Sequence, residues 1–368
     1  MINSRLNHLY SLFEEAGLEA IALNPGSSLT YLTGLTFHLM ERPTVLLLAP
    51  PATPAIILPE LEAGKIQASA FPLQVFTYDD NPANWEVAFL RACQYAKLDA
   101  QKIGVEKHRM RVLELWYLQK SMPHASFVSA EKVLEPLRIQ KDANEVAAMR
   151  QAVQIAQNGL HATLPMVKTG MTEKQIATEL ILNLLRAGSD PELPFNPIVS
   201  GGPNSANPHA VPSDRPLRSG DLLVIDWGAG FEGYFSDLTR TFAIGTVDPE
   251  LASIAEIVKR ANEAGRAAAR PGIPAGWVDQ ATRAVINATP YGPYFIHRTG
   301  HGLGMEAHEP PYIYGENNFI LPVGATFTVE PGIYLPDRGG VRIEDNMVIT
   351  STGAETLSDL PRELLTLG

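Results

Sequence analysis

Two aspartates flank a glycine-containing break in an apolar, β-prone stretch, and this arrangement constrains the fold more than any other feature of the chain. Asp226 lies near the end of the apolar run, and Asp237 lies in the return run, within residues 222–241. Such a pattern predicts an antiparallel hairpin. A turn centred between Phe231 and Glu232 would place the two aspartates directly opposite each other, with Cβ atoms roughly 5 Å apart. Because two carboxylates this close repel each other and lose hydration, we expect a divalent metal to compensate them.

The same arrangement recurs near the C-terminus. A β-prone run ends at Glu330, a glycine-containing break follows, and the return run ends at Glu344. A turn centred on Asp337 would place Glu330 opposite Glu344. Between the two hairpins, His301 lies in a glycine-rich segment whose backbone can approach another group closely.

Four carboxylates and one imidazole make up this candidate metal-ligand set: Asp226, Asp237, His301, Glu330 and Glu344. The set holds too many acids for one tetrahedral zinc site, and it suits two metals that share bridging carboxylates. Oxygen-rich ligands favour Mn²⁺, Co²⁺ or Fe²⁺. Two such ions can hold a bridging hydroxide and polarise a carbonyl oxygen. The alternative is that each acid is a surface strand residue or a salt-bridge partner.

Three further side chains are candidates for a role at this site. His209 precedes Asp226 by seventeen positions and His308 follows His301 by seven, so both lie on loops next to expected ligands and could donate a proton or a hydrogen bond. Arg342 lies two residues before Glu344 and therefore shares its face of the strand. It could bind a ligand carboxylate or anchor Glu344. No role is predicted for His297.

The composition limits the partners of the chain. With 368 residues the chain is long for one core, which suggests two domains. The net charge of −11 argues against nucleic acid and anionic membranes as partners. The single cysteine, Cys93, excludes an internal disulfide and is expected to be a core residue. No run of about 20 apolar residues and no signal-peptide pattern is present, so we expect a cytoplasmic protein.

The order of the expected elements predicts two kinds of domain. Runs typical of strands occupy residues 20–23, 45–48, 55–58, 103–106 and 126–128. These strands alternate with helices over residues 1–135, which indicates an α/β N-terminal domain. Residues 136–368 begin with helical patterns and continue into the two hairpins, which indicates an α+β domain. Thr172 and Gln175 are expected to form a capping box, and Asp248 to cap a helix that starts at Pro249.

Together these residues resemble the metallopeptidases of pita-bread fold, which include Xaa-Pro dipeptidase (prolidase), aminopeptidase P and methionine aminopeptidase, and the related creatinase. The stretch around Asn24–Pro25 resembles a creatinase-type N-terminal domain (1–135), and residues from about 140 resemble the catalytic domain (136–368). The five candidate ligands match the family's metal ligands, and His209 and His308 match its two catalytic histidines.

The resemblance implies a hydrolase in which a metal-bridging hydroxide attacks the scissile carbonyl. Glu330 would then act as acid or base, His308 would stabilise the developing oxyanion, and His209 would help to hold the substrate. The implied cofactors are two divalent ions, with Mn²⁺ expected and Co²⁺, Fe²⁺ or Zn²⁺ as alternatives. The implied partners are small Xaa-Pro peptides and a second copy of the chain in a homodimer.

The retained ligands and the large N-terminal domain favour the proline-specific enzymes over creatinase and methionine aminopeptidase. The tight hairpin between Glu330 and Glu344 resembles prolidases, whereas aminopeptidase P, which acts on longer peptides, tends to have a longer connection there. Many prolidases also carry a carboxylate-binding arginine soon after the second histidine, and no arginine follows His308 before Glu330. Arg342 or the partner subunit's Arg42 could replace it. A third alternative is a non-catalytic binding member of the family.

Overall fold

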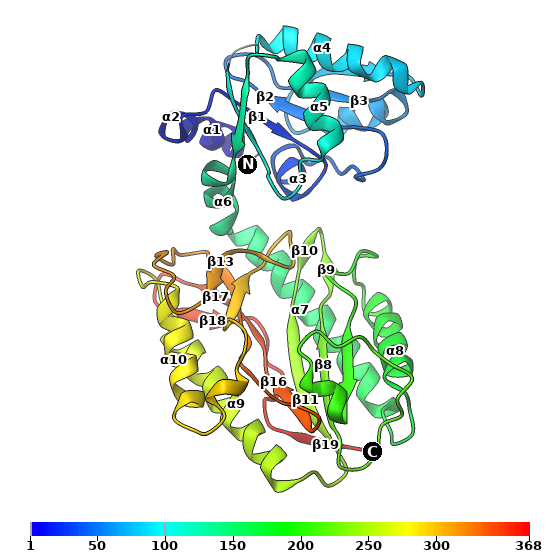
Figure 1. Cartoon of the computed structure of the whole chain (residues 1–368), viewed down its shortest axis with the longest axis vertical. Coiled ribbons are helices and arrows are strands. Elements are labelled where there is room, and N and C mark those ends of the chain that lie inside the picture. The colour runs from blue at the N-terminus through cyan, green and yellow to red at the C-terminus, as the bar shows by residue number, and fades with distance from the viewer. Residues whose placement is uncertain (1, 99–100) are drawn as a thin grey trace. The chain divides into compact units, whose positions relative to one another are not determined.

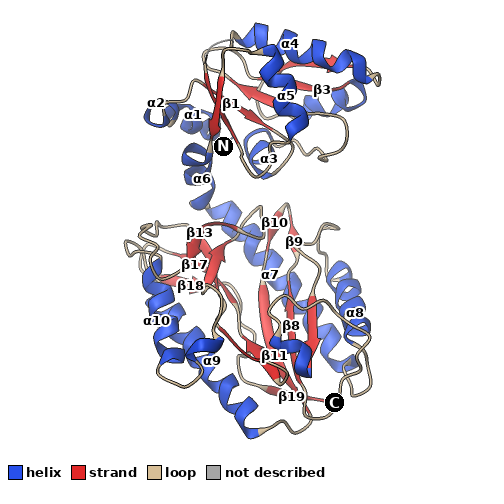
Figure 2. Ribbon diagram, viewed as in Figure 1, coloured by secondary structure: helices blue, strands red, loops and turns tan. Residues whose placement is uncertain are grey.

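The protein is described by a computed structural model that covers residues 2–98 and 101–368 (Figures 1 and 2). The chain separates into two compact units, residues 1–138 and 139–368. The division lies three residues beyond position 135, where the sequence patterns suggested a boundary. A helix, α6 (Glu131–Ile139), covers this position and was not predicted.

The N-terminal unit is built on one six-stranded mixed sheet with the order β4-β3-β2-β1-β5-β6. Its strands are β1 (Ala20–Leu23), β2 (Val45–Leu48), β3 (Ala55–Pro59), β4 (Gln74–Tyr78), β5 (Lys102–Val105) and β6 (Ser126–Ser129). Strand β1 pairs antiparallel with β2 and parallel with β5. All of these strands except β4 were predicted to within about one residue, so the α/β expectation is confirmed.

Helices complete the N-terminal unit. They are α1 (Ile2–Ser11), α2 (Phe13–Ala16), α3 (Ser27–Thr33), α4 (Trp85–Ala96) and α5 (Val112–Ser121), with 3₁₀ segments η1 (Glu60–Ala68) and η2 (Pro82–Asn84). Helix α4 buries Phe89 and Cys93 in the core beside the sheet. Cys93 is thus a buried free thiol, as expected from the sequence.

The C-terminal unit contains four long helices. They are α7 (Ala143–Thr163), α8 (Glu173–Arg186), α9 (Pro249–Ala268) and α10 (Gly276–Asn287), with 3₁₀ segments η3 (Leu164–Met166), η4 (Gly202–Ala206) and η5 (Gly292–Tyr294). The capping box of Thr172 with Gln175 forms as predicted. Asp248 caps α9, and Pro249 occupies its first turn, also as predicted.

Two main sheets lie between these helices (Figure 2). The four-stranded sheet has the order β19-β11-β8-β7 and the five-stranded sheet the order β13-β12-β14-β17-β18, and two strand pairs, β9/β10 and β15/β16, extend from them. The bounds are β7 (Ile198–Gly201), β8 (Leu222–Trp227), β9 (Gly230–Phe231), β10 (Tyr234–Phe235), β11 (Leu238–Ile244), β12 (Gly300–Gly302), β13 (Glu309–Ile313), β14 (Thr326–Val329), β15 (Gly332–Leu335), β16 (Gly339–Arg342), β17 (Asp345–Ile349), β18 (Ala354–Thr356) and β19 (Leu365–Leu367).

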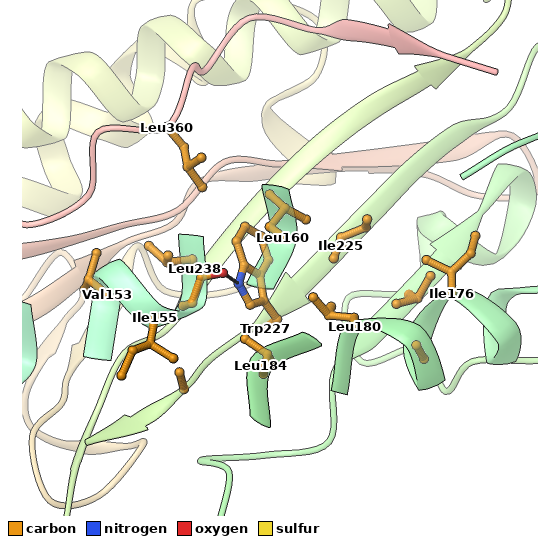
Figure 3. Packing of buried hydrophobic residues seen from close by; sticks show 14 of the residues in the cluster. Val153, Ile155, Leu160, Ile176, Leu180, Leu184, Ile225, Trp227, Leu238 and Leu360 are labelled. Atoms are coloured by element: carbon orange, nitrogen blue, oxygen red, sulfur yellow. Dashed lines mark hydrogen bonds between the residues drawn. The ribbon is translucent and has the colours of Figure 1, made fainter. Parts of the chain in front are cut away.

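The helices α7 and α8 pack on the four-stranded sheet around Trp227 (Figure 3). The Trp227 ring is fully buried, and its Nε1 donates a hydrogen bond to the Ala156 carbonyl oxygen at 2.9 Å. Because successive side chains of a strand point to opposite faces, the burial of Trp227 against the helices directs Asp226 to the other face of β8. The packing of this core therefore determines on which side of the sheet the first expected ligand lies.

The two main sheets meet where β11 approaches the end of the second hairpin. Glu344 N donates to the Thr239 carbonyl oxygen at 3.0 Å, which links the chain just before β17 to β11. The Asn346 side chain exchanges hydrogen bonds with the backbone N–H and C=O of Asp237, so β17 also holds the chain just before β11. This junction brings the two carboxylate-bearing hairpins together. Within the part of the chain that the structure describes, no helix combines the length and the apolar character needed to cross a membrane.

Candidate metal centre

The first hairpin forms, but with a different register from the predicted one. Phe231 pairs with Tyr234, so the turn consists of Glu232 and Gly233, and both have positive φ (52° and 77°), as a tight two-residue hairpin turn requires. Asp226 consequently lies opposite Thr239, and the predicted pairing of Asp226 with Asp237 is wrong. The observed partner of Asp226 lies two residues beyond the predicted one. Because side chains alternate between the two faces of a strand, a shift of two residues leaves Asp237 on the predicted face. Asp237 therefore still projects on the side of Asp226.

The second hairpin has the predicted register. Val329 pairs with Asp345 and Gly332 with Arg342, so the pairing on both sides of the acids is consistent with a turn centred on Asp337. Glu330 and Glu344 lie between these two paired segments. The two carboxylates therefore stand across from each other at the position where β14 leads into β15.

His301 lies in β12, between two glycines that pack tightly against neighbouring strands. A Cβ atom at Gly300 would overlap the Thr328 carbonyl oxygen, and one at Gly302 would overlap that of Pro310. The expected close backbone approach is thus confirmed. The His301 Nδ1 lies 3.0 Å from the Gly302 carbonyl oxygen, and because a carbonyl only accepts, Nδ1 carries the proton. Nε2 is left to face the carboxylates, as in a metal-binding imidazole.

The structure brings all five expected ligands together. Ligand atoms lie within 4.8 Å of one another in three overlapping groups: Asp237, His301 and His308; His301, Glu330 and Glu344; and Asp226, Asp237 and Glu344. His301 Nε2 lies 3.2 Å from Glu330 Oε1 and 3.6 Å from Asp237 Oδ2. All of these residues line one cavity of about 460 Å³. Overlapping groups with shared carboxylates are the geometry expected of a site for two neighbouring cations.

The electrostatics of the cluster are unbalanced without a cation. Burial raises the pKa of Asp226, Asp237 and Glu344, and neighbouring carboxylates raise each pKa further. Burial acts in the same direction on Glu330, but the hydrogen bond and charge of His301 outweigh it and lower the Glu330 pKa to about 2. Four ionised carboxylates in this space would repel one another, and bound cations remove that repulsion.

One buried oxygen tests directly whether the residues fit a metal. Asp226 Oδ2 accepts a hydrogen bond from Arg342 Nη2 at 2.6 Å, whereas Asp226 Oδ1 is buried and has no hydrogen-bond partner among the described residues. An unsatisfied buried carboxylate oxygen is costly unless something coordinates it. The oxygen-rich donor set with one imidazole suits a hard or borderline divalent ion. The residues therefore fit a divalent metal site.

Arg342 is held entirely by the protein. Its side chain donates to Thr239 Oγ1 (3.1 Å), the Pro208 carbonyl oxygen (3.2 Å), the Tyr334 hydroxyl (2.9 Å) and Asp226. Glu344 instead accepts from Thr239 Oγ1 at 2.7 Å. The expectation that Arg342 anchors Glu344 is therefore corrected: Arg342 anchors Asp226 and reaches Glu344 only through Thr239.

Both predicted histidines lie at the cavity. His209 and His308 line it and are exposed to solvent. The ring of His308 lies 3.8 Å from that of His301, between centroids, where the paired strands β12 and β13 carry a bulge. Bulges re-aim side chains and are frequent at functional sites. Burial and the neighbouring His301 lower the pKa of His308 to about 4, so its imidazole is neutral near pH 7.

The sequence patterns missed three side chains at the site. His297 and Arg298 line the cavity, and Tyr334 links His297 to Arg342. His297 Nδ1 faces the Arg298 carbonyl oxygen at 2.8 Å, so its Nε2 accepts a hydrogen bond from the Tyr334 hydroxyl at 2.9 Å. The only signal for His297 and Arg298 was their proximity in sequence to His301.

Known proteins share both parts of this architecture. The profile described as metallopeptidase family M24 matches residues 147–351, and the creatinase/prolidase N-terminal domain matches residues 5–140. An Xaa-Pro dipeptidase of Lactobacillus helveticus is 32% identical over 98% of each chain. A prolidase structure from Thermococcus sibiricus matches with a TM-score of 0.95 and 34% identity over 100% of this chain and 99% of that chain. An X-Pro aminopeptidase structure from Thermotoga maritima matches with a TM-score of 0.85 and 29% identity over 98% and 99%.

The matches cover both units, and the M24 profile spans the segment that carries the four clustered acids and the imidazole. The chain belongs to metallopeptidase family M24, with a creatinase/prolidase N-terminal domain and a pita-bread catalytic domain.

Proposed function

We propose that the protein is an Xaa-Pro dipeptidase that binds two divalent metal ions through Asp226, Asp237, His301, Glu330 and Glu344. The convergence of these five groups in one cavity carries the proposal, because it supplies ligands for two cations beside space for a small peptide. The relatives named Xaa-Pro dipeptidase and prolidase support the choice of substrate. The oxygen-rich donor set favours Mn²⁺ over softer ions.

The roles of the side chains follow from their positions. When bound, divalent cations polarise a substrate carbonyl and lower the pKa of water. Glu330 Oε1 lies 3.2 Å from His301 Nε2, and its carboxylate lines the cavity, where it is in place to accept and return a proton. Neutral His308 offers an N–H to the oxygen that becomes anionic, and His209 on the opposite loop contacts the substrate.

Arg342 and Thr239 act on the ligands rather than on the substrate. Arg342 orients Asp226, and Thr239 orients Glu344, so each carboxylate presents a defined oxygen to the cavity. Such supporting hydrogen bonds fix the ligand geometry and tune metal affinity. We expect the active form to be a homodimer, as the family resemblance implies.

Aminopeptidase P activity is the second candidate. The X-Pro aminopeptidase of Thermotoga maritima has the same fold over nearly the whole chain, and no arginine follows His308 before Glu330. A dipeptidase must recognise the free carboxylate of the proline residue, whereas an aminopeptidase must leave that direction open for the rest of the peptide.

The assay that separates the two compares Ala-Pro with Ala-Pro-Ala as substrates of the Mn²⁺-loaded enzyme. A dipeptidase cleaves Ala-Pro with the higher kcat/KM. A strong preference for Ala-Pro-Ala would move the assignment to aminopeptidase P, and the absence of turnover on both peptides, with metal bound, would favour a non-catalytic binding protein.

A further inference from the structure

A dipeptidase needs a cation at a defined place in its cavity. The carboxylate of the substrate's proline is anionic, and the inner wall of the cavity already carries four acidic side chains. The group that binds the substrate carboxylate must therefore be a positive side chain that reaches the cavity and is not already neutralised by the protein.

The basic side chains that line the cavity are two arginines and four histidines, and most of them are engaged or neutral. Arg342 is buried and directs its donors to Asp226, Thr239, Tyr334 and Pro208. His297 has both ring nitrogens hydrogen-bonded, and burial lowers its pKa. His301 and His308 both belong to the cluster of candidate metal-binding groups.

Arg42, the other candidate from the sequence, is also engaged. Its side chain forms ion pairs with Glu41 and Asp80 in the N-terminal unit, at 2.6 and 2.7 Å. Its Nε and Nη1 atoms already donate hydrogen bonds to these two carboxylates. Arg298 is thus the remaining arginine at the cavity wall.

The Arg298 guanidinium is available for a ligand. It stacks over the Tyr312 ring at 4.3 Å from the centroid, and among residues 2–98 and 101–368 no carboxylate or other acceptor takes a hydrogen bond from it. A stacked guanidinium uses its face, so the N–H groups along its edge remain free to donate. Arg298 is partly exposed and lines the same cavity as His308 and the carboxylate cluster.

The backbone that carries Arg298 is held rigidly on helix α10. Asp279 Oδ1 accepts hydrogen bonds from the Thr299 N–H (3.1 Å) and hydroxyl (2.8 Å). Arg283, which pairs with Asp279, donates to the His297 carbonyl oxygen at 2.8 Å. Both neighbours of Arg298 are therefore fixed, and the stack on Tyr312 restrains the side chain itself. A pre-organised guanidinium loses little entropy when it binds a carboxylate.

We propose that Arg298, stacked on Tyr312, binds the free carboxylate of the substrate's C-terminal proline and so selects dipeptides. This assignment rests on the proposed Xaa-Pro dipeptidase function. It also explains how the enzyme can bind the carboxylate of the substrate although no arginine follows His308 before Glu330. Tyr312 acts as a positioning residue, because it contacts the guanidinium and not the substrate.

The test compares two substrates that differ only in charge at the C-terminus, Ala-Pro and Ala-prolinamide, with the Mn²⁺-loaded enzyme. The wild type should have a higher kcat/KM on Ala-Pro. In Arg298→Met, the ratio of the two kcat/KM values should fall by about 10- to 100-fold, the worth of one charged hydrogen-bonded contact, mainly through KM. Arg298→Lys should keep part of the ratio, because it retains the charge but not the planar fork.

Two further variants control the interpretation. Arg260→Met removes an arginine from the exposed surface of α9 and should leave the ratio as in the wild type. Tyr312→Leu removes the stack and should lower the ratio, whereas Tyr312→Phe should keep it. The melting temperature of each variant shows that it is folded.

The outcomes distinguish the two proposals. An equal loss of activity on Ala-Pro and Ala-prolinamide in Arg298→Met, or a wild type that does not discriminate between them, would overturn the assignment of Arg298. If Arg298→Met does not fold, Arg298→Lys is compared with the wild type instead. An equal ratio of kcat/KM on Ala-Pro to that on Ala-prolinamide in these two proteins would then overturn the assignment. A wild type that cleaves Ala-Pro-Ala but not Ala-Pro would instead contradict the dipeptidase function itself.

Discussion

Lys141 Nζ and Glu309 Oε1 lie 2.5 Å apart, with only 2% and 3% of their side chains exposed. Lys141 stands at the start of the catalytic unit, and Glu309 directly follows His308. Gly304 allows this pair to form, because a Cβ atom there would lie 2.8 Å from Lys141 Cε and 2.9 Å from Glu309 Oε1. The buried pair therefore ties the segment that carries His308 to the beginning of the catalytic unit.

Lys141→Met should destabilise the protein strongly. Lys141→Met removes the buried cation that pairs with the Glu309 carboxylate, so the free energy of unfolding should fall by about 3–5 kcal/mol. Urea denaturation of the metal-loaded protein measures this change. The double variant Lys141→Met/Glu309→Met removes both charges and should recover much of the loss. A single variant within about 1 kcal/mol of the wild type would show that Glu309 is not buried with Lys141.

Asp237→Asn and Glu344→Gln should each abolish activity without unfolding the chain. Each change removes a charged ligand from the cluster but keeps the size of the side chain, so we expect kcat/KM to fall by more than about 100-fold. The far-ultraviolet circular dichroism should stay that of the wild type. Asp359→Asn, on the exposed surface, is the matched control. Turnover retained by either ligand variant would contradict the ligand assignment.

Chelation of the metal should leave a protein whose stability falls as the pH rises. Burial and nearby carboxylates raise the pKa of Asp237 and Glu344 in the folded state. A raised carboxyl pKa contributes stability that is present below the unfolded value of about 4 and is lost as the pH rises through the folded value.

The free energy of unfolding of the chelated wild type should therefore decrease with pH above about 5, and that of chelated Asp237→Asn should decrease less steeply. Added Mn²⁺ should remove this decrease with pH in the wild type, because the cation compensates the ionised carboxylates. If the free energy of unfolding depended on pH equally in the two chelated proteins, the neighbouring carboxylates would not repel Asp237, which would contradict the prediction.

Cys93 should be unreactive in the folded protein. Burial raises the pKa of its thiol to about 12, so almost no thiolate exists at pH 8. A thiol reagent should modify one group per chain only after denaturation, and the labelling rate in mild urea should report the opening of the N-terminal unit. Rapid labelling of the native protein would place Cys93 at the surface.

The elements with local signals could be predicted from the sequence. The first and second hairpins, the capping box of Thr172 and the start of α9 all follow from patterns within a few neighbouring residues. The five candidate ligands could be identified because acids on apolar strands need compensation. Strand β4 was missed because it lies at the edge of its sheet, and only two of its five side chains are buried.

Other features depend on contacts that no local pattern contains. The register of the first hairpin depends on which residues of the turn take positive φ, and Glu232 does so beside Gly233. The anchoring of Asp226 by Arg342 joins residues 116 positions apart. The availability of Arg298 could not be predicted either, since it depends on the fold placing Tyr312 beneath the guanidinium.

The content of bound metal tests the central claim most directly. The purified protein, stripped with a chelator and dialysed against Mn²⁺, should bind two ions per chain by elemental analysis, and Asp226→Asn/Glu344→Gln should bind fewer. Kcat/KM on Ala-Pro should return as the ions are restored. A folded wild type that takes up no divalent ion, or that hydrolyses Ala-Pro equally well without one, would contradict the account.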